Sequence, residues 1–425
     1  MPNQSHSHRK QLILNMINHL GPISRTELIA LTDYRPATVG AIIKELLEKQ
    51  MILETGYQSA GHGRKRVMLE INKNRLCAIG ISFTAKSVIY IVAQINGNIL
   101  QKSESPIRPS QAKAELAKEI TAHVRQLLAA FDGKDIVGIG ICNPLYDPTS
   151  YQDNHSLSAN YTHFNDWIHD GLKPMLEALF DGSVKTFSGV TLPALAEHRF
   201  GVAKGAQNFI CVELSNGIGA SIFCNGTAVA GANGVAGELG HTVIEYNSPV
   251  QKLCYCGKPG CVESSTAYPA LAADIKAALD RGVFSVLNSY HDRASEITVQ
   301  EIRRALDEED RMCMYYVKEA AVRLGVVIAN AVNLLNPELI ILYGFMLELG
   351  DYFLQQLETS IRANVLSLSG NFEIRRSVSL ETTMPLGAVA EIFSAYLKID
   401  DYKWIYQLQR SDLEEKMELP GSIPD

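Results

Sequence analysis

At 425 residues with 46% hydrophobic side chains, the chain can bury more than one core, so two or three domains are expected. The net charge of −7 is uneven, because residues 1–70 hold nine Lys and Arg against six Asp and Glu (+3), which leaves −10 for the remainder. Only this basic head is expected to face a polyanion. The sequence has no leader-like segment and no apolar run of about 18 residues, so we expect a soluble, cytoplasmic protein without disulfides.

The N-terminal segment carries a pattern of three helices. Apolar residues recur at helical spacing over residues 12–20 and stop at Gly21-Pro22. Ser24 followed by Glu27 is a capping box that opens a short second helix. Pro36 suits the first position of a third helix, because its missing N–H would be unpaired there. A short helix, a tight turn and a helix with a small polar outer face are typical of a helix-turn-helix.

Two short strands are predicted after the third helix, over residues 51–54 and 67–71, joined by the segment GYQSAGHGRKR. Such a basic, glycine-containing wing suits phosphate or a minor groove. We therefore predict a winged helix-turn-helix domain over residues 1–72 that binds DNA. The alternative is a small helical interaction domain with a solvated basic loop. The expected DNA contacts, from the third helix and the wing, are Arg35, Thr38, Lys44, Arg64, Lys65 and Arg66.

The rest of the chain repeats one order of elements. From Cys77 a buried strand, a turn and further strands run to Asn96-Gly97, helical segments follow at 111–131, and another buried strand ends at Asn143-Pro144. A second round opens with FICVELSNGIGASIFCNGTAVAG and closes with the strand and turn LIILYGFML. Two such rounds predict two α/β lobes with a cleft between them.

Three of the eight cysteines lie in the stretch CYCGKPGCVE, residues 254–263. Three thiols make neither a disulfide framework nor a complete tetrahedral metal site, and plain packing of buried thiols is the alternative. This stretch and the preceding ANGVAGELGHTV, residues 232–243, resemble the signature of the ROK family of repressors, open reading frames and kinases. With a winged helix in front, residues 8–399 resemble the repressor branch of that family.

The resemblance implies an α/β, two-lobed, actin-like and hexokinase-like body over residues 73–399. The tail at 400–425 lies outside the resemblance, and its role is unknown. It implies a structural zinc ion whose fourth ligand is the histidine of GELGH, because a closed four-ligand site leaves no position for a reacting water. The second nitrogen of that histidine, two glutamates and an asparagine are implied to hold sugar hydroxyls, although each glutamate alone would be an ordinary surface charge. The implied zinc ligands are His241, Cys254, Cys256 and Cys261, and the implied sugar-binding residues are Glu238, His241, Glu263 and Asn160.

The kinase pattern of the family is degraded in this chain. The aspartate base belongs in an Asn-Asp pair some eight residues before a helical glutamate, and counting back from Glu197 places Ser188-Gly189 there. The first phosphate turn has Phe83 in place of the usual glycines, and Tyr343 stands where a glycine is common on the nucleotide side. Phosphoryl transfer is therefore not expected.

The pattern of the head and the resemblance to the ROK family together imply a sugar-responsive DNA-binding transcriptional regulator that is not an enzyme and represses genes of carbohydrate use. The family resemblance, and the need to read DNA with two heads, imply a homodimer or a dimer of dimers, and a symmetric pair of heads implies a palindromic operator. Two alternatives stay open here. One is an ATP-dependent sugar kinase with an accessory head, and the other is a regulator whose sugar site is vestigial and which responds to a protein partner.

Overall fold

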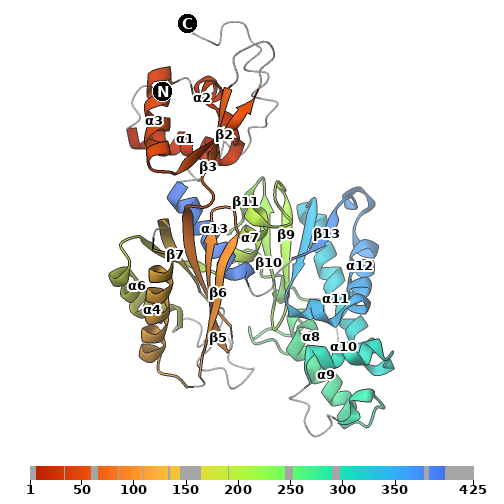
Figure 1. Cartoon of the computed structure of the whole chain (residues 1–425). Coiled ribbons are helices and arrows are strands. Elements are labelled where there is room, and N and C mark those ends of the chain that lie inside the picture. The colour runs from red at the N-terminus through yellow and green to blue at the C-terminus, as the bar shows by residue number, and fades with distance from the viewer. Residues whose placement is uncertain are drawn as a thin grey trace.

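Figure 1 shows the computed structural model of the chain, in which a small N-terminal head lies above a body that contains two sheets and their covering helices. The structure describes residues 6–32, 34–58, 66–84, 86–108, 110–132, 135–143, 164–189, 191–244, 252–289, 297–377 and 382–397. Within these ranges, no helix combines the length and the hydropathy that a membrane span requires.

The head contains the three predicted helices and a small sheet with strand order β1-β3-β2. The capping box at the start of the second helix is confirmed, since the Glu27 N–H donates to Ser24 Oγ at 3.3 Å and the Ser24 N–H donates to Glu27 Oε2 at 2.6 Å. Pro36 occupies the first turn of the third helix, as expected. The elements of the head are α1 (His6–Leu20), β1 (Ile23–Ser24), α2 (Arg25–Thr32), α3 (Pro36–Glu48), β2 (Ile52–Gln58) and β3 (Arg66–Ile71).

The two five-stranded sheets of the body share one strand order. The first runs β6-β5-β4-β7-β8 and the second β11-β10-β9-β12-β13, so each has three antiparallel strands followed by two parallel ones. This repetition confirms the two predicted α/β lobes. The strands of the first sheet are β4 (Leu76–Phe83), β5 (Ser87–Gln94), β6 (Ile99–Pro106), β7 (Asp135–Asn143) and β8 (Ser183–Ser188). Those of the second are β9 (Phe209–Leu214), β10 (Ile218–Cys224), β11 (Thr227–Ala228), β12 (Leu339–Tyr343) and β13 (Glu373–Arg376).

Helices cover each sheet on the side away from the centre of the body, and two more helices lie between the lobes (Figure 1). The first sheet is covered by α4 (Lys113–Ala130), the π-helical turn η1 (Ile168–Leu172) and α6 (Lys173–Leu179). The second lobe contains η2 (Leu239–His241), α8 (Glu263–Thr266), α9 (Tyr268–Asp280), α10 (Val299–Asp307), α11 (Arg311–Leu335), η4 (Phe345–Leu349), α12 (Asp351–Asn364) and η5 (Ser367–Ser369). The central helices are α7 (Leu192–Phe200) and α13 (Thr383–Leu397).

The central helix α13 lies directly on the first sheet and on α7. A Cβ atom added to Gly140 in β7 would lie 2.8 Å from the carbonyl oxygen of Ala388, and one added to Gly387 would lie 2.1 Å from that of Leu192. These glycines therefore permit a backbone-to-backbone approach that no larger residue allows.

The head shares buried apolar surface with the first lobe. Strand β3 ends at Ile71 and β4 begins at Leu76, so few residues separate the two parts. One cluster of buried apolar side chains joins residues of the head such as Ile17 to body residues such as Ile91 and Phe393. Because burial of apolar area is the dominant stabilising term in folding, this shared cluster contributes to holding the head on the body.

Candidate metal centre and ligand site

Two neighbouring segments bring the predicted metal ligands together. The short helix η2 ends at His241, and an isolated bridge between Val243 and Cys261 ties this segment to the cysteine-rich one. Within the second segment, the Gly257 N–H donates to the Cys254 carbonyl oxygen at 2.9 Å and closes a tight turn. Main-chain hydrogen bonds thus fix the positions from which the histidine and the thiols extend.

The four predicted ligands form one cluster, since the ligand atoms of His241, Cys254, Cys256 and Cys261 all lie within 4.8 Å of one another. The Cys254 Sγ is 3.6 Å from His241 Nδ1, and the Sγ atoms of Cys256 and Cys261 are 3.7 Å apart. Metal–sulfur bonds of about 2.3 Å at tetrahedral angles place two thiolates about 3.8 Å apart. The cluster therefore fits a tetrahedral metal ion, with Nδ1 as the nitrogen ligand.

The other imidazole nitrogen of His241 faces away from the thiols. Its Nε2 lies 3.1 Å from the Tyr255 hydroxyl and 3.6 Å from Glu238 Oε2. The family resemblance assigned this nitrogen to a sugar together with Glu238 and Glu263, and it gave no role to Tyr255, which lies between two of the cysteines. With Nδ1 turned to the thiols, Nε2 is the atom that can exchange hydrogen bonds with Tyr255, Glu238 or a ligand.

Glu263, at the start of α8, is buried with 7% of its surface exposed. Its Oε2 accepts a hydrogen bond from the Ile218 N–H at 2.8 Å, whereas its Oε1 is buried and has no donor among the described residues. Burial raises the pKa of this carboxyl group and the Glu238 carboxylate adds to that shift, whereas the Ile218 N–H, nearby His241 and the Tyr255 hydroxyl oppose it. Because an unpaired buried acceptor is costly, Oε1 is an acceptor available to a ligand hydroxyl.

Two glycines near Glu263 make room for its carboxylate. Gly217 lies between β9 and β10, and a Cβ atom added to it would be 3.1 Å from Glu263 Oε2. A Cβ atom added to Gly240 would be 3.0 Å from the same oxygen and 2.3 Å from the carbonyl oxygen of Ile218. Both glycines therefore make room for the Glu263 carboxylate.

The expected nucleotide side of the body is occupied by a polar trio. Tyr343, at the end of β12, is 7% exposed and pairs in register with Glu213 of β9. The Tyr343 hydroxyl donates to Glu213 Oε2 at 3.0 Å, and the Ser215 hydroxyl donates to Oε1 at 2.6 Å. Burial raises the pKa of Glu213, and the two hydroxyl donors oppose that shift. The side chains of Tyr343, Glu213 and Ser215 thus occupy the position where the kinase pattern has a glycine turn.

The expected position of the catalytic base is crowded as well. Gly189 is buried, and a Cβ atom there would lie 2.9 Å from both the Asn143 carbonyl oxygen and the Met384 Cε. On the first phosphate turn, Phe83 packs edge-on against Phe164 with ring centroids 5.4 Å apart. An aspartate at position 189 would require Met384 to move, and the phosphate turn carries an aromatic contact instead of glycines.

The predicted DNA contacts on α3 lie on its outer face. Arg35 is exposed just before the helix, Thr38 is half-buried, and Lys44 is 78% exposed at 3.9 Å from Glu48. Arg66 begins β3 and is half-buried. The opposite face of α3 packs into the core of the head, so this outer face is the one left accessible to solvent. The predicted site residues Arg64, Lys65 and Asn160, and the tail at 400–425, lie outside the described residues.

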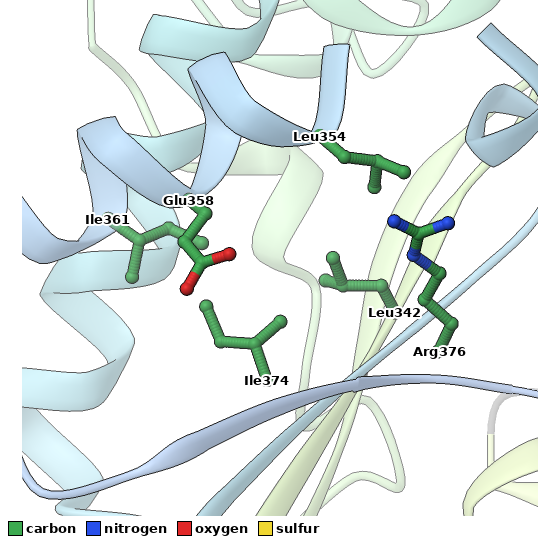
Figure 2. Close-up of a pocket in the computed structure, with 6 residues that line it drawn as sticks. All are labelled: Leu342, Leu354, Glu358, Ile361, Ile374 and Arg376. Carbon is green, nitrogen blue, oxygen red and sulfur yellow. The ribbon is translucent and has the colours of Figure 1, made fainter. Parts of the chain in front are cut away.

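A separate cavity of about 120 Å³ lies between α12 and strands β12 and β13 (Figure 2). Figure 2 shows Glu358 and Arg376 on opposite sides of an apolar lining. Small-molecule sites typically enclose about 300–1,000 Å³, so this cavity is below the usual size. None of the predicted site residues lines it, since its lining consists of Leu342, Leu354, Glu358, Ile361, Ile374 and Arg376.

Known proteins resemble the chain over most of its length. The model of the ROK family matches residues 78–391. A xylose repressor from Caldicellulosiruptor bescii is 28% identical over 396 residues, which cover 92% of this chain and 97% of that protein. The DNA-binding transcriptional dual regulator NagC from Escherichia coli strain K12 is 26% identical over 392 residues, which cover 91% of this chain and 92% of that protein.

A solved structure shares the fold. The crystal structure of a ROK family transcriptional regulator, a homologue of the E. coli MLC protein, superposes with a TM-score of 0.74 at 24% identity, and the match covers 95% of this chain and 100% of that one. The duplicated strand order, the cluster of one histidine and three cysteines, and the family match over residues 78–391 together show that the chain belongs to the ROK family.

Proposed function

We propose that the protein is a sugar-responsive transcriptional regulator that represses genes of carbohydrate use. The observation that carries the proposal is that one chain combines two parts. The first is a three-helix head whose α3 has an exposed outer face, and the second is a ROK-family body in which the positions expected for kinase chemistry are crowded by other atoms. Relatives named xylose repressor and NagC, which match more than nine-tenths of the chain, support it.

The head binds operator DNA through α3 and the wing. Arg35, just before α3, and Lys44, on the outer face of α3, are suited to guanine edges or phosphates, and Thr38 can contact either. Arg66 and its neighbours Arg64 and Lys65 supply cationic contacts to phosphate from the wing. A symmetric dimer would present two heads, so the operator is expected to be palindromic.

The ligand site is built from Glu238, His241 and Glu263, with Asn160 as a further contact. His241 Nε2 can exchange a hydrogen bond with a sugar hydroxyl, and the unpaired Glu263 Oε1 and the half-exposed Glu238 carboxylate can each accept one. Zinc would be held by Nδ1 of this histidine and three thiolates, and would fix the orientation of its ring. Four protein ligands leave no open position, so the metal's role is structural.

We infer that the chain is not a sugar kinase, from three observations. The base position at Gly189 is crowded by Met384, the first phosphate turn carries Phe83 against Phe164, and Tyr343 with Glu213 fills the nucleotide side. Phosphoryl transfer needs a base, a phosphate cradle and a metal ligand at once. Loss of the base and of the phosphate cradle, together with the filled nucleotide side, argues for a binding protein.

Selection of duplexes from a random-sequence DNA pool by the full purified chain tests DNA binding. We expect enrichment of a twofold-symmetric site, and a loss of about tenfold or more in affinity for that site in Arg35→Ala, since a bidentate base contact contributes about 1–3 kcal/mol. Arg304→Ala, at an exposed arginine of the second lobe, should bind as the parent does. A pool without any enriched sequence would overturn the proposal.

An assay of ADP release across a panel of sugars tests the alternative of a sugar kinase. No turnover above that of a boiled sample is expected. Turnover that Glu263→Gln abolishes would establish a kinase and contradict the inference drawn from Gly189 and Tyr343.

A further inference from the structure

Helix α1 links the DNA-binding helix to the central helix of the body. Lys10 Nζ donates to Glu45 Oε1 on α3 at 2.8 Å, and His6 Nε2 lies 2.9 Å from the other oxygen of that carboxylate. Further along α1, Gln11 Nε2 donates to the carbonyl oxygen of Tyr396 at 3.0 Å. One short helix therefore contacts α3 of the head and the C-terminal end of α13.

Helix α13 in turn contacts both lobes. Its middle lies on the first sheet, where Ala388 approaches Gly140 of β7. Its first residue, Thr383, has its hydroxyl 3.4 Å from that of Ser377, whose N–H donates to the carbonyl oxygen of Leu342 in β12 at 2.9 Å. A change in the angle between the lobes therefore acts on α13, and α13 ends at the head.

The contact between α1 and α13 is centred on Asn15, a fully buried amide within an otherwise apolar cluster. Its Nδ2 donates to the carbonyl oxygen of Gln11 at 3.1 Å and to that of Leu397. Its Oδ1 is buried and has no hydrogen-bond donor among the described residues. An unpaired buried acceptor weakens an arrangement on the order of tenfold in equilibrium constant or more, so the amide both directs this contact and weakens it.

We propose that Asn15 is the release point of the head, meaning the residue that determines how easily the head leaves the body. Its amide N–H positions the head against Leu397, and its unpaired Oδ1 keeps this docking only weakly stable. A single buried polar residue is known to set register at a cost in stability. A ligand that favours another lobe angle would then move α13 and shift the head, which changes DNA affinity only if the two arrangements bind DNA differently. The effect on DNA rests on the proposed function, whereas the docking is a property of the chain alone.

Hydrogen exchange of the full chain, without DNA or sugar, tests the docking. Asn15→Leu removes the unpaired Oδ1 and adds apolar contact, and we expect this gain to exceed the loss of the bond to Leu397, so that its α1 amides exchange about tenfold more slowly than the parent's. Asn15→Asp places a carboxylate against the Leu397 carbonyl oxygen, and we expect exchange about tenfold faster. Asn18→Leu is the matched control on the same helix, because Asn18 is half-buried and makes no bond to α13 among the described residues.

Slower exchange in Asn15→Leu and faster exchange in Asn15→Asp, with Asn18→Leu unchanged, support the proposal. Equal exchange in all three variants would overturn it, as would faster exchange in a folded Asn15→Leu. If Asn15→Leu does not fold, Gln11→Ala tests the docking instead. Loss of the exposed hydrogen bond from Gln11 to Tyr396 should make the α1 amides exchange severalfold faster, and an unchanged exchange rate would refute the contact between α1 and α13 as the docking point.

Measurements of DNA affinity then separate this proposal from the function on which it rests. If the head docks more tightly on the body in Asn15→Leu, any effect of sugar on its affinity for DNA should fall to less than about twofold. An undiminished effect would count against Asn15 as the release point. Failure of the parent chain to select any DNA would refute the proposed function, while the exchange rates would still decide whether Asn15 controls docking.

Discussion

At the scale of single residues, the two ring nitrogens of His241 face different partners. Nδ1 lies with the thiols and Nε2 lies with Tyr255 and Glu238. The Cys-x-Cys-Gly spacing indicated three thiol ligands, and the resemblance to the ROK family implied His241 as the fourth. Which nitrogen faces the metal, and the role of Tyr255, depend on ring orientation and could not be predicted from sequence.

Removing one thiol should remove the metal. Cys256→Ser leaves three ligands, so we expect its zinc content by elemental analysis to fall from stoichiometric to background, and its thermal midpoint to fall by at least about 5 °C. Cys224→Ser changes a half-buried thiol outside the cluster and should keep its zinc. Equal zinc content in the two variants would exclude this cluster as the metal site.

Glu45 makes the head sensitive to acid. Its pKa is lowered to about 2, first by the hydrogen bond from Lys10 and then by those from His6 and Lys49. Because the folded pKa lies below the unfolded value of about 4.3, the stabilisation is complete above that value and is lost as pH falls from there towards 2. Solvent screening keeps the effect modest, since this carboxylate is partly exposed.

Replacing Glu45 should flatten this dependence. The thermal midpoint of the head, followed by circular dichroism, should fall between about pH 5 and pH 3 in the parent and fall less in Glu45→Gln. Glu48→Gln, on the same helix and beside Lys44 instead of the α1 cations, should follow the parent. A slope in Glu45→Gln as steep as the parent's would show that other groups control the acid transition.

At the scale of elements, periodicity predicted the helices of the head and the repeated strands of the body. The predicted strand 51–54 was too short, since β2 runs Ile52–Gln58 and shifts register between Glu54 and Tyr57. A strand with an irregularity of this kind loses strict alternation, so pattern alone ends it early. The close packing of α13 against Gly140 was also not predicted, because a glycine in a strand does not indicate which segment packs against it.

The close packing of α13 against Gly140 can be tested by adding one methyl group. In Gly140→Ala the new Cβ would meet the Ala388 carbonyl oxygen at 2.8 Å, so we expect a loss of about 1–3 kcal/mol in the free energy of unfolding. Gly219→Ala is the matched control in β10, because a Cβ there meets nothing within 4 Å. Chemical denaturation of both variants measures the difference, and a Gly140→Ala as stable as Gly219→Ala would show that α13 can shift freely.

At the scale of the whole molecule, repetition of the strand and turn pattern predicted two lobes, and the shared strand order confirmed them. The assignment of residues 1–72 to a separate domain stays a prediction. The docking of the head could not be foreseen, because Asn15 and Leu397 are 382 positions apart and meet only through the completed fold. The crowding of Gly189 by Met384 arises in the same way. Local patterns predict elements, while contacts between distant segments decide what the site can do.

Coupling between the ligand site and the head is tested most directly by fluorescence anisotropy of a selected DNA duplex across a panel of pentoses, hexoses and N-acetylated hexosamines. At least one sugar should change the Kd of the parent chain for DNA by about 5- to 150-fold, the usual range of allosteric coupling. Glu263→Gln should lose this change, because it alters the acceptor at Oε1, whereas Glu308→Gln, at an exposed position just after α10, should keep it. A Kd that no sugar changes, or one that Glu263→Gln still allows to change in full, would contradict a sugar-responsive repressor built on this site.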